Sequence, residues 1–346
     1  LNSKVFKYIF GQLNPTLNFQ SGEVAKFPII IIKSDIIEQL VEENVQISID
    51  EYNSYETSWD FLQHPLIKYS RNNLMEDSFE KWKKLCDVHF NKMKENEIEL
   101  NRQYIQIYGL EKEISPEEGD ELITLRVANK EVDIKSFVSY AVGCMFGRYS
   151  LDEEGLICAG GEWDNSKYKT FLPDDDNCIP ITDEEYFSDD IVARFVEFVR
   201  TVYGADTLEE NLDFIANALG NKGDTSREVI RNYFLKDFYA DHLKVYQKRP
   251  IYWLFDSGKQ NGFKALIYMH RYDADTVGRV RTDYLHRAQK YVETAMQSAQ
   301  YTIDNATSAS EKSKATKAVT KYTKQLAEMK IYDEAIAHIA NKRIEI

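Results

Sequence analysis

Residues 276–346 contain no proline, and their only glycine is Gly278. Proline and glycine are the residues that most often end a helix, so this stretch can be helical almost throughout. Apolar side chains recur at alternating steps of three and four residues over 284–303 and again over 319–340. The polar stretch 304–310 separates the two segments. The sequence therefore predicts a long antiparallel helical hairpin in this part of the chain.

The rest of the sequence predicts shorter helices and a few strands. Helices are expected at 1–13, 34–44, 77–108, 134–149, 189–203, 208–219 and 226–246. Strands are expected at 26–32 and 121–127, and two further runs, 250–255 and 263–270, form a β-hairpin around the turn-rich loop 256–262. Long connections are expected at 48–70 and 150–182. The predicted fold class is α+β and predominantly helical, with mixed lobes, short strands and the C-terminal helical hairpin.

The formal net charge of −14 speaks against a nucleic-acid partner when it is taken whole. The charge is unevenly distributed, however. Residues 1–110 sum to −4, residues 111–220 to −17 and residues 221–346 to +7. Because a binding face needs local charge, the last third can still meet a polyanion, and the acidic middle is expected to face away from it or to meet a basic protein.

Several classes of protein are not expected from the sequence. No apolar run approaches the roughly 20 residues of a membrane-spanning helix, so no membrane partner is expected. The four cysteines contain no C-x-x-C pair, which fits the reducing cytoplasm better than a disulfide framework or a zinc site. The chain begins with Leu1 and shows no signal segment, and we expect it to be a fragment of something larger.

Familiar catalytic motifs are also missing. The run Ser257–Gln260 lacks the residues of a phosphate-binding loop, and neither G-x-S-x-G nor H-E-x-x-H occurs. The acidic run Asp174–Asp176 has oxygen ligands suited to Mg²⁺. No lysine follows it at the spacing of a metal-dependent nuclease, so a solvated loop or a helix cap is the favoured interpretation and no metal site is expected.

Several long stretches carry a resemblance. They are Asn14–Pro28, Tyr55–Pro65, Ser139–Asp152, Lys248–Lys259, Gly262–Arg271 and Val280–His286. Asn14–Pro28 resembles the segment that leaves the catalytic domain of large adenine-specific DNA methyltransferases. The others are similar to the PglX-type methyltransferases of BREX phage-defence systems, in the region C-terminal to the catalytic domain.

The resemblance implies a parent enzyme that transfers a methyl group from S-adenosylmethionine to adenine N6. The family's cofactor loop and its Asn/Asp-Pro-Pro-Tyr/Phe motif are missing here, because the only Asn-Pro pair, Asn14-Pro15, is followed by threonine. No catalytic residue and no cofactor is therefore expected in this fragment, which alone should be inactive. The expected partners are double-stranded DNA, the missing methyltransferase domain and other phage-defence proteins.

On this interpretation the chain divides into five segments. They are 1–32, the exit from the absent methyltransferase domain; 33–115, helical; 116–220, acidic and mixed; 221–275, a basic helix with a β-hairpin; and 276–346, the helical hairpin.

An enzyme that extrudes a base needs a second module for phosphate and base-edge contacts. The basic third offers candidates, among which glutamine and asparagine can pair with adenine. The predicted DNA-binding residues are Lys248, Arg249, Lys259, Gln260, Asn261, Lys264, Arg271, Arg279, Arg281 and Arg287. Interleaved aspartates can instead pair with these cations on a solvated face. A second hypothesis is a protein-docking scaffold for other defence components.

Overall fold

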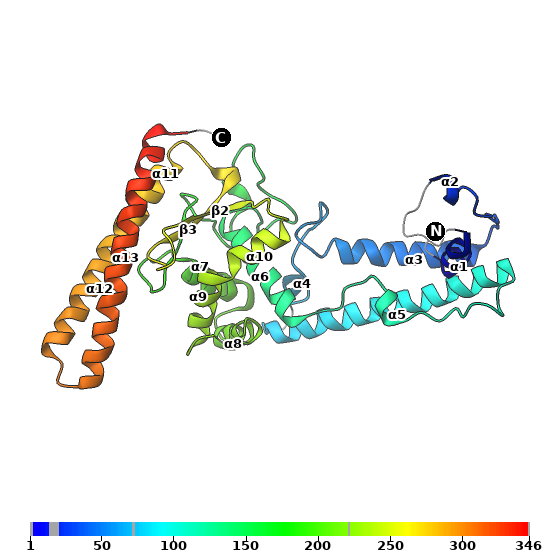
Figure 1. Ribbon diagram of the computed structural model, residues 1–346, viewed down its shortest axis with the longest axis horizontal. Coiled ribbons are helices and arrows are strands. Elements are labelled where there is room, and N and C mark those ends of the chain that lie inside the picture. The colour runs from blue at the N-terminus through cyan, green and yellow to red at the C-terminus, as the bar shows by residue number, and fades with distance from the viewer. Residues whose placement is uncertain (1–2, 14–20, 71–72, 221, 345–346) are drawn as a thin grey trace. The chain divides into compact units, whose positions relative to one another are not determined.

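The computed structural model describes residues 3–13, 21–70, 73–220 and 222–344 (Figure 1). Part of the segment that carries the resemblance, residues 14–20, lies outside the described residues. The described chain divides into two compact units, one made of residues 1–58 and 79–129 and the other of residues 59–78 and 130–346.

The first unit is helical. Its helices are α1 (Lys4–Leu13), α2 (Ser21–Val24), α3 (Asp35–Tyr52) and most of α5 (Met75–Tyr108), followed by a 3-10 turn at Asp120–Leu122. Ser34 caps α3 as expected, because its hydroxyl accepts a hydrogen bond from the amide of Ile37. On α1, Phe6 and Phe10 stack at 5.0 Å between ring centroids and are buried.

The second unit contains the sheet and the remaining helices. The helices are α4 (Pro65–Lys68), α6 (Lys130–Met145), α7 (Ile191–Tyr203), α8 (Leu208–Ala218), α9 (Ser226–Lys236), α10 (Phe238–Val245), α11 (Thr276–Arg279), α12 (His286–Asn305) and α13 (Ala309–Lys342). Short 3-10 turns lie at Asn165–Lys167 and Met269–Arg271, and a π-helical turn at Val280–Leu285 joins α11 to α12.

The sheet has three antiparallel strands in the order β1-β3-β2. They are β1 (Ile179–Ile181), β2 (Tyr252–Asp256) and β3 (Lys264–Tyr268). Strand β3 is central, and its alternate side chains point to opposite faces. Ala265 and Ile267 lie in the apolar cluster that includes the terminal helices. On the other face, Tyr268 lies beside Phe146, directly after α6.

Helix α6 is buried nearly all round, as its run of small and apolar residues predicted. Phe137, Val138, Ala141 and Met145 are fully buried. The aromatic side chains of α7 pack on it, with the ring centroids of Phe137 and Phe198 5.7 Å apart. This core supports the acidic connection that follows α6.

The predicted helical hairpin is confirmed by α12 and α13, which are joined by only three residues and pack along each other (Figure 1). Buried residues from both helices, including Val292 and Met329, share one cluster with the sheet. The predicted fold class, α+β and predominantly helical, is also confirmed.

Other local predictions were wrong. The predicted strand 26–32 begins in a turn and forms no strand, and its isoleucines are exposed, Ile31 by 90%. The predicted strand 121–127 contains no strand, and only a 3-10 turn forms at its start. The predicted helix 226–246 is split at Asp237, and α3 continues eight residues past Asn44 to Tyr52. Periodicity detected apolar runs here, but a strand forms only where a partner strand is available.

Candidate functional site

A cavity of about 820 Å³ opens in the second unit. It lies between the acidic connection after α6 and the segment that runs from the end of β3 into α11. Four carboxylates line it, from Asp174, Asp175, Asp176 and Asp273, together with the guanidinium groups of Arg271 and Arg279. The lining is therefore strongly polar and, on these side chains, net negative.

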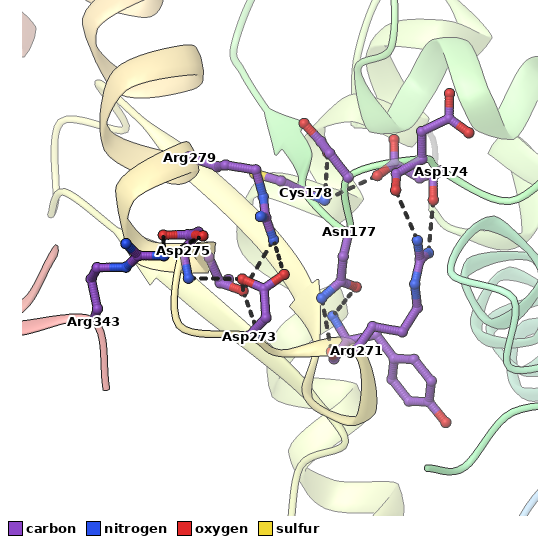
Figure 2. Close-up of polar contacts among 12 residues, drawn as sticks. Asp174, Asn177, Cys178, Arg271, Asp273, Asp275, Arg279 and Arg343 are labelled. Carbon is purple, nitrogen blue, oxygen red and sulfur yellow. Dashed lines mark hydrogen bonds and ion pairs between the residues drawn. The ribbon is translucent and has the colours of Figure 1, made fainter. Parts of the chain in front are cut away.

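Arg271 holds the acidic connection in place. It stands at the end of the 3-10 turn after β3, and its Nη1 donates to the carbonyl oxygen of Asp174 at 2.7 Å (Figure 2). The same nitrogen donates to the carbonyl oxygen of Phe146 at 3.3 Å. Its Nη2 donates to the carbonyl oxygen of Asp175 at 3.0 Å. The guanidinium also lies 4.2 Å from the ring centroid of Trp163. Arg271 thus satisfies backbone acceptors that irregular chain would otherwise leave unpaired.

A carboxylate pair lies beside it. The amide of Cys178 donates to Oδ1 of Asp174 and to Oδ1 of Asp176, each at 3.0 Å. The Tyr284 hydroxyl lies 2.9 Å from Oδ2 of Asp176 and 3.2 Å from Oδ2 of Asp189, and its single proton serves one of them at a time. Burial, reinforced by the neighbouring charge of Asp176, raises the pKa of Asp174 to about 7.

The second arginine of the cavity belongs to a chain of ion pairs (Figure 2). Nη2 of Arg279 donates to Oδ2 of Asp273 at 2.8 Å, and the Asp275 amide donates to the other oxygen of Asp273 at 2.9 Å. Asp275 in turn pairs with Arg343, just beyond α13, at 2.8 Å. These contacts connect the mouth of the cavity to the end of the chain that the structure describes.

Two ionisable side chains in and beside the cavity have shifted pKa values. Cys178 lies beside the lining residues, and burial raises the pKa of its thiol well above the usual value, so the nucleophilic thiolate is disfavoured. Burial also lowers the pKa of His270. Over residues 3–13, 21–70, 73–220 and 222–344, no group of three or more His, Cys, Asp or Glu side chains is placed to hold a metal ion.

S-adenosylmethionine is the cofactor that the resemblance implies for the parent enzyme. The ring of Trp163 stacks on Tyr168 at 5.1 Å and is covered by Arg271, so it offers no free face to an adenine. Both arginines of the cavity are already bonded within the chain.

Four of the ten predicted DNA-binding residues have side chains that donate to carbonyl or carboxylate oxygens of the fold. Lys264 donates to the Leu235 carbonyl at 2.9 Å and lies 3.4 Å from Asp256. Arg281 donates through Nε to Asp333 at 2.7 Å. Arg271 and Arg279 make the contacts described above. These side chains stabilise the fold, as the interpretation of paired charges allowed.

The remaining cations are more accessible. Arg287 is exposed, donates to the Tyr291 hydroxyl at 3.3 Å and lies over the ring of Phe187. Lys248, Arg249 and Lys259 are exposed and form no ion pair within the described part of the chain. The first two precede β2 and Lys259 follows it, so a five-residue strand, about 17 Å long, separates them. The structure does not gather all ten residues on one patch.

The loop between β2 and β3 is held by α13. The Glu328 carboxylate accepts hydrogen bonds from the Ser257 hydroxyl and from the amides of Gln260 and Gly262, at 2.8–3.3 Å. The Gln325 side chain donates to the carbonyl oxygens of Gln260 and Asn261. These bonds fix the backbone of the loop and leave the Lys259 and Gln260 side chains exposed.

The sequence did not predict that Trp163 stacks on Tyr168, and it did not predict strand β1. Both lie in the irregular 150–182 connection, where side chains follow no period. The only signal there is the acidic run Asp174–Asp176, whose sequence favours a loop or a helix cap over a metal site.

Comparisons with known proteins extend over the whole chain. The chain is 45% identical over 353 aligned residues to an adenine-specific methyltransferase, PglX, of Lacticaseibacillus casei (strain Zhang). It is 36% identical over 376 aligned residues to an adenine-specific methyltransferase, BrxX, of Escherichia coli O9:H4 (strain HS). The chain spans 29% and 31% of the lengths of these relatives and matches their C-terminal region. No protein-family profile matches it, and no described helix is long and apolar enough to cross a membrane.

Proposed function

This chain belongs with one region of the PglX- and BrxX-type adenine-specific methyltransferases, and we propose that it supplies the DNA target-recognition and C-terminal region of such an enzyme in a BREX-type phage-defence system. The observation that carries the proposal is the 45% identity that extends along the whole chain. Double-stranded DNA and other components of the defence system are the proposed partners.

Catalysis and cofactor binding are assigned to another part of the enzyme. The only Asn-Pro pair of this chain is followed by threonine, so the family's Asn/Asp-Pro-Pro-Tyr/Phe motif is missing. The chain alone is therefore expected to bind DNA without methylating it. Such a module supplies the phosphate and base-edge contacts that hold a duplex while another domain extrudes the target base.

The exposed members of the predicted set are the proposed contacts. Lys248 and Arg249, which precede β2, can neutralise phosphates, and so can Lys259, which follows β2. The loop that carries Lys259 and Gln260 is held rigid by α13, which lowers the entropy lost when its side chains meet a groove. The Gln260 amide is suited to an adenine edge.

Duplex binding tests this function directly. At about 50 mM salt the 346-residue chain should retain a duplex in a filter-binding assay, with affinity falling as salt increases. Lys248→Ala with Arg249→Ala should reduce the slope of log affinity against log salt by about 1.8, at about 0.9 for each lost phosphate contact. A matched control, Lys83→Ala with Lys84→Ala, removes two exposed charges from α5 and should change this salt slope little. Absence of duplex retention by the unmodified chain would refute the proposal.

The cavity supports a second candidate, a docking surface for a basic protein. Residues 111–220 carry a net charge of −17, and four carboxylates line the cavity. Reversal of the ion-paired arginines would disturb the fold, so the test uses exposed residues. The test is co-purification of a co-expressed component of the defence system with each variant. If this candidate holds, the component still binds the double variant Lys248→Glu with Arg249→Glu but no longer binds Asp175→Lys. The opposite pattern favours DNA recognition.

A further inference from the structure

Helix α13 carries a row of four lysines outside the set that the sequence analysis selected. Lys314, Lys317, Lys321 and Lys324 follow one another at steps of three, four and three residues. This spacing places them on one face of an α-helix. All four are exposed, and ten residues of helix separate the first from the last by about 15 Å. We refer to them as the lysine row.

Most of the lysine row is not compensated by acidic side chains. Lys321 pairs with Asp183 at 2.7 Å and with Glu184 at 3.2 Å. Lys314, Lys317 and Lys324 form no ion pair within residues 222–344 or elsewhere in the described chain.

The neighbours along the helix explain this for Lys317 and Lys324, whereas Glu311 lies three residues before Lys314 and forms no ion pair with it in the described chain. The residues three and four positions from Lys317 are two lysines, a serine and a threonine. Glu328, one turn after Lys324, already accepts three hydrogen bonds from the loop between β2 and β3. Like charges at this spacing destabilise a helix by about 0.2–0.5 kcal/mol for each pair, a cost that a bound polyanion offsets.

The wider surroundings are positive as well. Residues 295–327 contain five lysines, with Asp304 and Glu311 as their only acids. Hydroxyl side chains fill many of the other positions, and those of Thr316, Thr320 and Thr323 donate to carbonyl oxygens four residues earlier. In a chain of net charge −14, this is a local concentration of positive charge, in which Lys321 alone forms an ion pair among the described residues.

The lysine row is also accessible. Among the described residues, the hydrogen bonds from α13 to the body of the second unit begin at Lys321 and Tyr322, which both contact Glu184. The earlier part of α13 packs along α12, and the turn between them lies at the end of the hairpin away from the sheet (Figure 1). Lys314 and Lys317 stand on this outer part.

We propose that the lysine row binds the phosphate backbone of duplex DNA. The inference rests on the proposed function and assigns to it a surface distinct from the β2–β3 loop. Successive phosphates of one strand rise 3.4 Å along the duplex axis, so the 15 Å row spans about four of them. Lysine is a compact charge without a fixed hydrogen-bonding geometry, so these contacts position the duplex and read no bases.

The test compares two double variants of the 346-residue chain that lose the same charge from opposite faces of α13. Lys314→Gln with Lys317→Gln removes half of the lysine row. Lys312→Gln with Lys330→Gln removes two exposed lysines from the other side. Filter binding of one duplex between about 50 and 200 mM salt gives the affinity and the salt slope of each, and circular dichroism confirms that both variants are folded.

The row variant should bind about 10- to 100-fold more weakly at 50 mM salt, with a slope reduced by about 1.8. The control should stay within about twofold of the unmodified chain. If that chain binds DNA but the two variants are affected equally, or neither is affected, the lysine row is not a DNA contact and the proposed function stands. If the unmodified chain does not bind DNA, both the proposed function and this inference fail.

Discussion

The ion pair between Arg231 of α9 and Asp190 at the start of α7 gives the sharpest test of the energetics of the second unit. Nη1 of Arg231 lies 2.6 Å from Oδ2 of Asp190, and both side chains are almost completely buried, at 9% and 0% exposed. The same nitrogen donates to the Thr182 carbonyl at 2.8 Å. The other oxygen of Asp190 caps α7 by accepting from the Ala193 amide at 2.8 Å. One carboxylate thus serves a helix terminus and a buried cation.

Arg231→Met keeps an unbranched apolar stem and removes the charged guanidinium group. Asp190 would then be an uncompensated buried carboxylate, and removal of one partner from such a pair typically costs about 3–5 kcal/mol. A domain is usually stable by about 5–15 kcal/mol in total, so this loss is a large share. Asp190→Ala should cost a similar amount, because it leaves Arg231 buried and also removes a cap worth about 0.5–2 kcal/mol.

The measurement is the free energy of unfolding in urea, followed by circular dichroism and tryptophan fluorescence. The matched control, Arg227→Met, lies one turn earlier on α9. Its guanidinium donates to both oxygens of Glu209 at 2.7 Å, but the pair is exposed and should contribute only about 0–1 kcal/mol. If Arg231→Met costs less than about 1 kcal/mol, or no more than Arg227→Met, the argument from burial is refuted.

Three further predictions concern the cavity and the hairpin loop. The pKa of Asp174 is about 7 in the folded protein and 3.8 in the unfolded chain, so between these pH values the folded protein binds the extra proton and its stability should fall as pH rises. Thermal unfolding at pH 5 and pH 8 measures this loss. Asp174→Asn should abolish it, and the control Asp175→Asn should not. Glu328→Ala should increase hydrogen exchange in the β2–β3 loop at least tenfold, since bonds to a charged acceptor contribute about 1.5–3 kcal/mol, and unchanged exchange would contradict that role. Gly147→Ala should cost about 1–3 kcal/mol in urea unfolding, because φ is +75° and the new Cβ would overlap the ring of Trp163; a neutral effect would argue against that packing.

The elements predicted best are those with a long period. The α12–α13 hairpin follows from 71 residues without proline, and even the charged residue that interrupts its apolar pattern has a structural reason. Asp333 occupies an otherwise apolar position, and there it accepts from Arg281 at 2.7 Å and lies 2.9 Å from His286. The sequence could not show these partners, because they are 52 and 47 residues away from Asp333.

The candidate site was predicted less well, again because the partners of its side chains are distant in the sequence. A cation is available to DNA only if no acid meets it in the fold, and the acceptors of Arg271 lie 96 to 125 residues away in the chain. Short strands failed similarly. Ile179–Ile181 is a strand because β3 lies beside it, whereas the richer apolar run at 29–32 has no partner strand in the described chain. Pairing over long distances decides both cases.

The attachment of α13 has a mechanical consequence. The helix is about 51 Å long, and its polar attachments to the body of the second unit lie between Lys321 and Asp333, with Arg343 just beyond its end. Residues 309–320 of α13 precede these attachments and extend about 18 Å beyond them. Movement of this outer part would turn the helix about its contacts with the β2–β3 loop. A force on the tip of the hairpin is therefore transmitted as a torque to the bonds of Gln325 and Glu328, and through them to the orientation of Lys259 and Gln260.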